Sequence, residues 1–445
     1  MKITIIDSIM SKVDRPDLLR PYFSFKKEFW KKGIYKRERM KYDFFLIDKK
    51  GNFLTGFIPR ITKHCQDNNI DLVIEGQLEK IKPGKILLQG LTLRDDQQRL
   101  IETALSRGRG ILKSPTGSGK TIIACGIMSA YKKYRVLFLC HTISLLKQTK
   151  EEIERFGLGP VSIVGSGSKD LSGKIVVSTM QSLIKIPIED YCDKFDVVFI
   201  DESHHCRDFN NTYAKLLKCL LAPVKLGLTA TIPTDKESVL AMEGLLGPVI
   251  DELTLEEGMR LEILAKPTVK LIKVPPNEAT RDLRKYHDIY EAGIVTFRKR
   301  NRLIIEEAKK LSDEGKSSLI YVTQIEHGER LVGIADLLGL PVTFIKGDVD
   351  AETREQLRHD LHNKKILTVI ATVVWKEGIN VRSLDCIMIA GGGKSELALL
   401  QTVGRGFRRD VNKKEILIID FLDSSRYLAE HAIERLGVYI ENEWI

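Results

Sequence analysis

The sequence predicts an α/β protein with two tandem parallel-sheet domains after a small basic α+β domain. Short apolar runs alternate with helical stretches from Leu91 to Lys273, and the alternation begins again from Val274 to Ile445, as doubly wound parallel sheets require. Charge is unevenly placed, because residues 1–90 contain 19 Lys and Arg against 11 Asp and Glu, whereas the other 355 residues contain 51 against 49. We therefore expect a basic accessory domain at 1–90 and parallel-sheet domains at 91–273 and 274–445.

The composition favours a globular protein of a reducing compartment. Hydrophobic residues make up 43% of the chain and charged residues 29%, the usual balance for globular domains. No apolar run approaches the roughly 18 residues that span a membrane, and the N-terminus lacks the layout of a signal peptide. The seven cysteines are scattered and never two or three residues apart, so neither zinc nor a disulfide framework is predicted. We expect a monomer in the cytoplasm of a bacterial or phage-infected cell.

Basic and aromatic residues are interleaved between Lys26 and Lys50. This pattern suits a groove that meets phosphates with Lys and Arg and offers rings for stacking on bases. We expect nucleic acid to contact Lys31, Arg37 and Lys41 there. The alternative is a core of aromatic residues in a small β-rich domain with a hairpin turned at 50–52, and both interpretations can hold in part. The residues of that core would be Phe44, Phe45 and Phe53.

A strand, a glycine-rich loop and a helix follow one another between Arg109 and Ala124. Such a loop points backbone N–H groups at a polyphosphate, while a Lys neutralises the outer phosphates and a Thr hydroxyl can hold Mg²⁺. Ser114 stands where a Gly would begin the usual pattern. The loop residues that we expect to bind ATP are Thr116, Gly117, Ser118, Gly119, Lys120 and Thr121.

Two adjacent carboxylates follow one of the expected strands, Val197–Ile200. Ligands of parallel sheets bind beyond the carboxyl ends of the strands, so we assign Asp201 to Mg²⁺ and Glu202 to the attacking water. The residues 204–206, His-His-Cys, lack a second pair of ligands at metal spacing, and zinc is not favoured. After the next strand, 229–231 (Thr-Ala-Thr) is either a hydrogen-bond relay or a helix cap.

The expected strands are short and apolar, as strands buried on both faces should be. In the first parallel-sheet domain they are Val136–Cys140, Ile175–Ser178, Val197–Ile200 and Val224–Leu228. In the second they are Leu319–Val322, Thr343–Ile345, Leu367–Ala371, Cys386–Ala390 and Ile416–Phe421.

The second parallel-sheet domain has no complete phosphate loop of its own. The run 391–395 (GGGKS) imitates one, but Met388 stands where the motif should begin, so we interpret this run as a tight turn into a helix. That helix and its exit carry Gln401, Arg405 and Arg408. The two arginines lie three apart on one helical face or turn, from which they can reach a γ-phosphate held by another domain.

Taken together in this order, the motifs resemble those of superfamily 2 helicases, and the match covers roughly Leu91 to Arg409. The adenine-reading motif is similar to LRDDQ at 93–97, motif I to SPTGSGKT at 114–121, motif Ia to the segment from His141, and motif Ic to 177–183. DESHH at 201–205 resembles motif II. The segments that resemble motifs III, IV, V and VI are, in that order, 227–231, 319–322, 371–378 and 401–408.

This resemblance implies two RecA-like domains with ATP and Mg²⁺ between them. ATP would close the cleft and hydrolysis would open it, so that each cycle moves the protein along a strand. The residues implied for the ATP site are Arg94, Gln97, Lys120, Thr121, Asp201 and Glu202 on one side and Gly378, Gln401, Arg405 and Arg408 on the other. Those implied for nucleic acid are His141, Ser178, Thr179 and Thr372.

Motif V departs from the family pattern, because Val373 and Asn380 stand where Asp is usual. This implies that either the contact to the ATP sugar or the coupling through that motif differs from the common form. The DESHH sequence and the basic domain before the motor are more similar to the DNA-directed XPB-like and UvsW-like branches than to DEAD-box RNA helicases. The resemblance thus implies a DNA helicase or translocase for forked and junction DNA in recombination, repair or replication restart.

Three other functions remain open. The first is a translocase on duplex DNA without strand separation, and the second is an RNA-remodelling ATPase of the same superfamily. The third is a DNA-binding scaffold that ATP only switches. Against the scaffold stand the water-activating carboxylate and the arginines of motif VI, which binding alone does not need.

Overall fold

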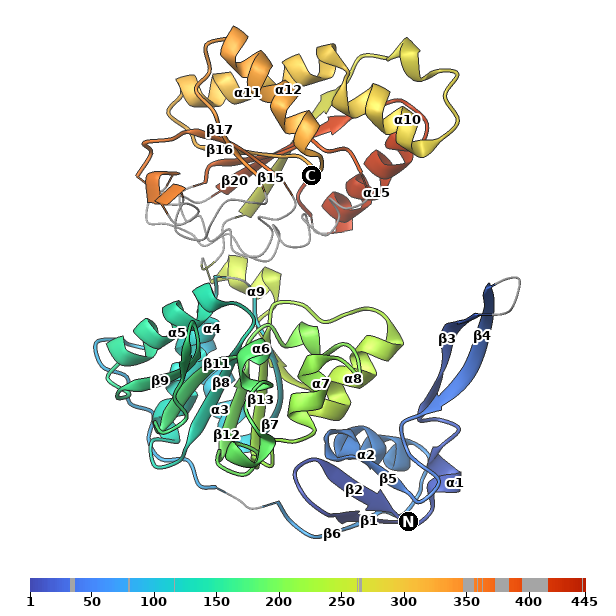
Figure 1. Ribbon diagram of the computed structural model, residues 1–445, viewed down its shortest axis with the longest axis vertical. Coiled ribbons are helices and arrows are strands. Elements are labelled where there is room, and N and C mark those ends of the chain that lie inside the picture. Colours follow the sequence, from blue (N-terminus) through green and yellow to red (C-terminus); the bar gives the residue numbers. More distant parts are fainter. Residues whose placement is uncertain are drawn as a thin grey trace. The chain divides into compact units, whose positions relative to one another are not determined.

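The computed structural model (Figure 1) describes residues 1–32, 37–78, 81–115, 117–261, 263, 266–346, 356–357, 359–361, 363–372, 384–393, 415–441 and 443–445. At residues 28–32, 37–40, 255 and 266 it describes the backbone alone. The chain divides into two compact units, one of residues 1–115 and 119–254 and the other of 255–445 together with 116–118.

The first 75 residues form a small α+β domain. Its sheet has the strand order β5-β2-β1-β6, in which β2 is antiparallel to β1 and β5, and β6 is parallel to β1. Strands β3 and β4 form a separate two-stranded ribbon that projects from the domain (Figure 1). The elements are β1 (Lys2–Ile5), β2 (Met10–Val13), α1 (Pro16–Leu19), β3 (Ser24–Lys32), β4 (Arg37–Phe45), β5 (Asn52–Leu54), α2 (Ile58–Asp67) and β6 (Val73–Glu75).

The expected hairpin at 50–52 is wrong. A turn is present there, with Gly51 at φ 86°, but it connects strands of different sheets, because Asn52 pairs with Lys12 of β2. The hairpin is formed instead by β3 and β4, in the register Ser24 opposite Phe45. Of the aromatic residues expected in the core, Phe53 is 1% exposed and Phe45 is 41% exposed.

The next segment forms an eight-stranded sheet with the order β10-β9-β11-β8-β12-β13-β7-β14. All neighbouring pairs are parallel except β9 and β10. The strands are β7 (Arg109–Lys113), β8 (Val136–Cys140), β9 (Val161–Gly165), β10 (Ser168–Lys169), β11 (Ile175–Thr179), β12 (Val197–Ile200), β13 (Val224–Thr229) and β14 (Val249–Glu252). The helices are α3 (Asp95–Arg107), α4 (Lys120–Ala130), α5 (Ile143–Arg155), α6 (Met180–Leu183), α7 (Thr212–Leu217) and α8 (Lys236–Leu246).

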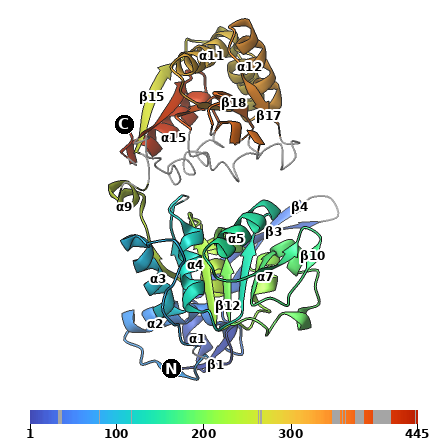
Figure 2. The ribbon, with the colours of Figure 1, turned by 90° about the vertical axis from the view of Figure 1, so that its left-hand side faces the viewer.

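Helices cover both faces of this sheet. Leu137 and Leu139 of β8 belong to a core cluster with α6, α7 and α8. Residues one position along a strand point to the opposite face, where Phe138 stacks on Phe199 at 5.9 Å. Figure 2 shows α3 and α4 on one side of the sheet and α7 on the other. The carboxyl ends of the strands and the loops that follow them are left for a ligand.

The N-terminal domain packs against α8. Its buried Phe53 and Phe57 share a core cluster with Leu240 and Ala241 of that helix. The backbones approach closely, since a Cβ added at Gly56 would lie 2.2 Å from the carbonyl oxygen of Glu243. The accessory domain is therefore part of the same compact unit as the eight-stranded sheet.

The second unit contains a six-stranded, all-parallel sheet with the order β15-β20-β19-β16-β18-β17. Its strands are β15 (Lys266–Lys273), β16 (Ser318–Tyr321), β17 (Thr343–Ile345), β18 (Thr368–Ala371), β19 (Cys386–Ile389) and β20 (Glu415–Leu422). Its helices are α9 (Leu255–Arg260), α10 (Tyr286–Tyr290), α11 (Arg298–Asp313), α12 (Ile325–Leu337) and α15 (Leu428–Glu441).

The end of the first parallel-sheet domain differs from the sequence expectation. We expected it near Lys273, but β15 pairs along its whole length with β20 of the second sheet, and the units divide between Thr254 and Leu255. The nine expected strands are all present, each with bounds within one residue of those expected. No helix in the described ranges combines the length and the apolar character needed to cross a membrane.

Candidate nucleotide-binding site

The loop between β7 and α4 has the backbone turns that its glycines allow. Gly117 (φ 88°) and Gly119 (φ 96°) adopt left-handed conformations, which are costly for residues with a Cβ. Lys120 begins α4, and its Nζ lies 3.5 Å from the carbonyl oxygen of Ser114. So long a hydrogen bond holds the amino group weakly, and it lies at a helix N-terminus where anions bind favourably.

Gln97 lies against the phosphate loop and is 1% exposed. Its Oε1 accepts a hydrogen bond from the backbone N–H of Arg94 at 3.2 Å, so the amide nitrogen is on the other side. A Cβ added at Gly119 would lie 2.7 Å from that nitrogen. The Arg94 guanidinium is in turn held by Asp96 through two hydrogen bonds of 2.9 Å. The start of α3 therefore fixes Gln97 beside the loop.

Asp201 and Glu202 lie at the carboxyl end of β12, which is separated from β7 only by β13. The backbone N–H of Glu202 donates to Oδ1 of Asp201 at 2.9 Å. Glu202 has φ 49°, a left-handed conformation that is strained for a residue with a side chain and is found mostly at functional sites. The chain therefore turns sharply directly after the end of β12.

The two carboxylates titrate in opposite directions. Burial and the neighbouring charge of Glu202 raise the pKa of Asp201 to about 6. Burial also opposes ionisation of Glu202, but the hydrogen bond from His204 and the positive charge of Lys120 outweigh it and lower that pKa to about 2. Glu202 is therefore ionised at neutral pH, and a cation beside Asp201 would favour its ionised form.

His204 connects Glu202 to motif III. Its Nδ1 lies 3.2 Å from Oε2 of Glu202 and 3.1 Å from Oγ1 of Thr229. The hydroxyl of Thr229 donates its hydrogen to the carbonyl of Thr231 at 2.9 Å, so it can only accept from His204. The proton therefore sits on Nδ1 of His204, and of the two interpretations of 229–231 this geometry favours the relay.

His141 lies in a stack of rings behind motif II. Its ring is parallel to that of His205 within 11°, at a centroid distance of 4.1 Å. Nδ1 of His141 is 2.8 Å from the hydroxyl of Tyr213 in α7, and His205 lies 4.3 Å from His204. The stack joins the ends of β8 and β12. His205 was visible in the sequence as part of motif II, but its stacking on His141 and the contact of His141 with Tyr213 arise only in the folded sheet.

The hydroxyls of Ser178 and Thr179 are buried, at 0% and 3% exposure. Ser178 donates to the carbonyls of Val164 and Thr179, and Thr179 caps α6 by accepting from the N–H of Ser182 at 3.2 Å. Both side chains hold the end of β11 in place, and their expected contact to nucleic acid stays a prediction.

The three basic residues expected to contact nucleic acid in the ribbon do not share a face. Lys31 pairs with Glu38 and Lys41 with Glu28. Positions alternate between the two faces along a strand, so the backbone register puts positions 37 and 41 on one face of the ribbon and position 31 on the other. Lys27, on the face of Lys31, contacts Glu237 of α8 with Nζ and Oε1 2.6 Å apart.

The remaining expected site residues divide into three groups. Thr121 is half-buried in the first turn of α4, and Ser118 is fully buried. Thr372 follows β18 and is 6% exposed. The residues Thr116, Gly378, Gln401, Arg405 and Arg408 lie outside the described ranges.

Two family models match the chain. Residues 90–234 match the model described as "Type III restriction enzyme, res subunit", and residues 299–410 match "Helicase conserved C-terminal domain". Together they cover more than half of the chain.

The chain is similar to curated relatives over most of their length. The ATP-dependent DNA helicase uvsW of Enterobacteria phage T4 is 25% identical over 78% of this chain and 75% of the relative. The DNA 3'-5' translocase XPB2 of Sulfurisphaera tokodaii is 25% identical over 79% of this chain and 86% of the relative. Among solved structures, the Pyrococcus furiosus Hef helicase domain has a TM-score of 0.53 at 15% identity, over 78% of this chain and 100% of that one. This structural likeness supports the fold.

Proposed function

The chain belongs to the superfamily 2 helicases, and from this premise we propose that it is an ATP-dependent DNA helicase or translocase that unwinds or branch-migrates forked and junction DNA. Recombination, repair or replication restart would require this activity. The relatives named above are a DNA helicase and a DNA translocase. The observation that carries the proposal is the proximity of Lys120 to Asp201 and Glu202. Lys120 is close enough for its positive charge to act in the direction of a lower pKa on both carboxylates.

The residues at this site fit ATP with Mg²⁺. Two left-handed glycines, a weakly held amino group and a helix N-terminus suit a polyphosphate, and hard oxygen ligands suit Mg²⁺. Lys120 would neutralise the outer phosphates, Thr121 and Asp201 would hold the ion, and Gln97 with Arg94 would read adenine. Bound Mg²⁺ would neutralise charge on the phosphates.

Glu202 would orient the attacking water. A pKa of about 2 leaves the carboxylate ionised but makes it a weak base, since an efficient general base has a pKa near the working pH. The lowered pKa therefore favours positioning of water through a hydrogen bond over full proton removal by Glu202 alone. His204 holds the carboxylate from the other side and links it to Thr229.

Motif VI would complete the site. Gln401, Arg405 and Arg408 would supply the sensor and the arginine fingers that stabilise charge on the phosphate during transfer, with Gly378 of motif V near the nucleotide. DNA would run past the ends of β8 and β18, near His141 and Thr372. The basic ribbon would hold duplex or junction DNA.

The test is ATP hydrolysis by the purified chain without polymer, with single-stranded DNA, duplex DNA, a branched junction and RNA. The junction and a fork are also scored for strand separation. Lys120→Ala serves as the inactive control, because it removes the charge at the outer phosphates. Stimulation by branched DNA with release of strands is the expected result.

Other outcomes would change the proposal. Stimulation by duplex without strand release would identify a duplex translocase, and stimulation by RNA alone would identify an RNA-remodelling ATPase. ATP binding with no hydrolysis under any condition would support the alternative of a DNA-binding scaffold that ATP only switches. Mg²⁺ dependence is measured by adding EDTA, which should abolish turnover.

A further inference from the structure

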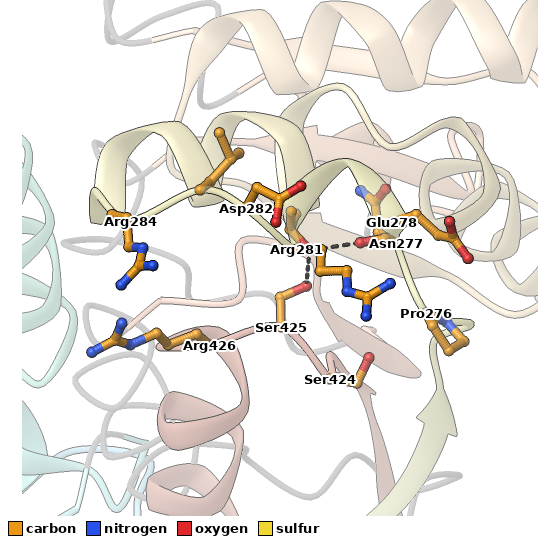
Figure 3. A pocket seen from close by; sticks show the side chains of 11 residues that line it. Pro276, Asn277, Glu278, Arg281, Asp282, Arg284, Ser424, Ser425 and Arg426 are labelled. Carbon is orange, nitrogen blue, oxygen red and sulfur yellow. Dashed lines mark hydrogen bonds between the residues drawn. The ribbon is translucent and has the colours of Figure 1, made fainter.

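A pocket of about 440 Å³ lies within the second unit, beyond the carboxyl ends of β15 and β20. Its walls are two segments far apart in sequence, 276–284 after β15 and 424–426 after β20. Figure 3 shows the two segments and the side chains that enter the space between them. This volume falls within the range of ligand sites in proteins, and the ends of parallel strands are where such sites form.

Three arginines line this pocket: Arg281, Arg284 and Arg426. All three are exposed, and within the described part of the chain none forms an ion pair with a carboxylate. In Figure 3, Arg284 and Arg426 point to the same end of the pocket, whereas Glu278 lies at the opposite end. With Asp282 also in the lining, the formal balance is three positive charges against two negative ones.

Two buried carboxylates at this end of the sheet are paired with arginines inside the protein. Asp423, which directly precedes the pocket segment, is buried and receives two hydrogen bonds from Arg300, at 2.9 and 3.2 Å. Asp420 of β20 is bound in the same way by Arg435 at 2.8 and 3.0 Å. Neither carboxylate is therefore left to attract the pocket arginines, which stay directed at solvent.

The walls of the pocket are fixed to each other. The hydroxyls of Thr280 and Ser425 are 2.7 Å apart and join the two segments, as the dashed line in Figure 3 shows. Below them, Leu283 and Tyr427 pack on a buried apolar cluster that includes Leu428 of α15. The Arg426 guanidinium lies 5.0 Å from the centre of the Tyr427 ring, which restrains it by a cation–π contact.

We propose that this pocket binds backbone phosphates of a DNA strand. Guanidinium groups recognise phosphate oxygens with paired N–H donors, and three exposed arginines around one pocket place several such donors within reach of a single anion. The inference rests on the proposed function, since DNA is the polyanion that a DNA helicase meets. It adds a contact site apart from the helicase motifs.

The test compares two triple variants of the full chain. Arg281→Ala, Arg284→Ala and Arg426→Ala are combined in the pocket variant. The control combines Arg302→Ala, Lys309→Ala and Arg330→Ala, which remove the same charge from α11 and α12, where each side chain is already paired with a carboxylate four residues away. Binding of a labelled single strand and a labelled duplex is measured by fluorescence anisotropy between 50 and 200 mM salt.

The pocket variant should bind DNA roughly tenfold more weakly at low salt, and the slope of log affinity against log salt should fall by about two. The control should stay within about twofold. Equal losses in both variants, or none in the pocket variant, would overturn the inference. A raised KM for ATP without polymer, with unchanged DNA affinity, would also overturn it and assign the pocket to a free nucleotide.

This experiment separates the inference from the function. DNA-stimulated hydrolysis by the unaltered chain tests the proposed function by itself. If that stimulation is present and the pocket variant binds DNA normally, only the inference fails. If the unaltered chain binds no DNA, both fail. Circular dichroism melting of both variants verifies that they fold.

Discussion

The imidazole rings of His141 and His205 stack at 4.1 Å, with an interplanar angle of 11°. His141 follows β8 and His205 follows β12, and these strands are direct neighbours in the sheet. The segment after β8 is the one expected to contact nucleic acid, and motif II is the one expected to contact ATP. The stack is therefore a physical link by which a shift of one segment can reach the other.

Replacing His205 by Ala should weaken the coupling between DNA and hydrolysis. We expect the ratio of DNA-stimulated to basal ATPase rate to fall about three- to tenfold, with basal rate changed less than twofold. The loss of ring contacts would also cost about 1 kcal/mol of stability, which thermal melting measures. His205→Phe keeps a flat ring and should restore most of the ratio. Equal ratios in all three proteins would show that the stack only supports the fold.

Changing Glu202 to Gln should separate ATP binding from turnover. The amide keeps the size of the side chain and an oxygen that can accept from His204, but it has no charge with which to orient water. We expect turnover to fall by at least about 100-fold and ATP affinity to stay within about threefold. Phosphate release and fluorescent-nucleotide binding measure these quantities. The exposed Glu151→Gln is the matched control, and near-normal turnover of Glu202→Gln would refute the assignment.

The ribbon residues should contribute unequally to DNA binding. Lys41 and Arg37 share a face that is opposite to that of Lys27, the residue held by Glu237. For junction DNA, the slope of log affinity against log salt should fall by about one in Lys41→Ala and in Arg37→Ala. Lys31→Ala should reduce this slope by less. Lys49→Ala, after the ribbon, is the control. Equal losses at Lys31 and Lys41 would mean that both faces contact DNA.

The two sheets could be predicted from the sequence because buried parallel strands leave a simple signal. Runs such as Val197–Ile200 are apolar throughout, and each expected strand is present. The end of the first unit was harder, since β15 has the composition of a strand in either sheet. Only its pairing with β20 assigns it.

The catalytic side chains were predictable where a short motif holds them, and the contacts between motifs were not. Lys120 and Asp201 follow strand ends that the sequence reveals. The proton on His204, the burial of Ser178 and the stacking of His205 depend on contacts between segments that are separated in the sequence. The opposite faces of Lys31 and Lys41 depend on register, which the misplaced hairpin turn obscured.

Burial of His205 makes the fold less stable in acid. Burial and the neighbouring His204 and His141 lower its pKa to about 4, outweighing Glu202, and Arg207 acts in the same direction. Because the folded pKa lies below the unfolded value of about 6.5, the unfolded chain binds the proton first as pH falls. This contribution to stability is present above pH 6.5 and is lost progressively down to pH 4.

His205→Phe should therefore reduce the acid dependence of unfolding. Thermal midpoints of the variant and the unaltered chain are compared from pH 7.5 to pH 4.5, and their difference should shift in favour of the variant as pH falls. The fully buried His327, whose pKa is also lowered, makes the fold less stable in acid in the same way. It is present in both proteins, so its effect cancels in the difference. A difference that is independent of pH would mean that His205 is protonated in the fold.

Lys225 should be replaceable by Met with a gain in stability. Its side chain is completely buried in β13, burial and the nearby Arg109 lower its pKa well below the usual value, and its Nζ has one long hydrogen bond of 3.4 Å, to the carbonyl of Leu217. Removing a poorly compensated buried amine while keeping the volume should stabilise the fold by about 1–3 kcal/mol.

The sign of the pH dependence gives this prediction a second test. A lysine whose pKa is lowered in the fold makes the protein more stable as pH rises towards about 10, because the unfolded chain holds the proton longer. Thermal midpoints should therefore favour Lys225→Met more at pH 6 than at pH 9, while the exposed Lys194→Met changes neither. A less stable Met variant would show that the bond to Leu217 outweighs the cost of burying the amine.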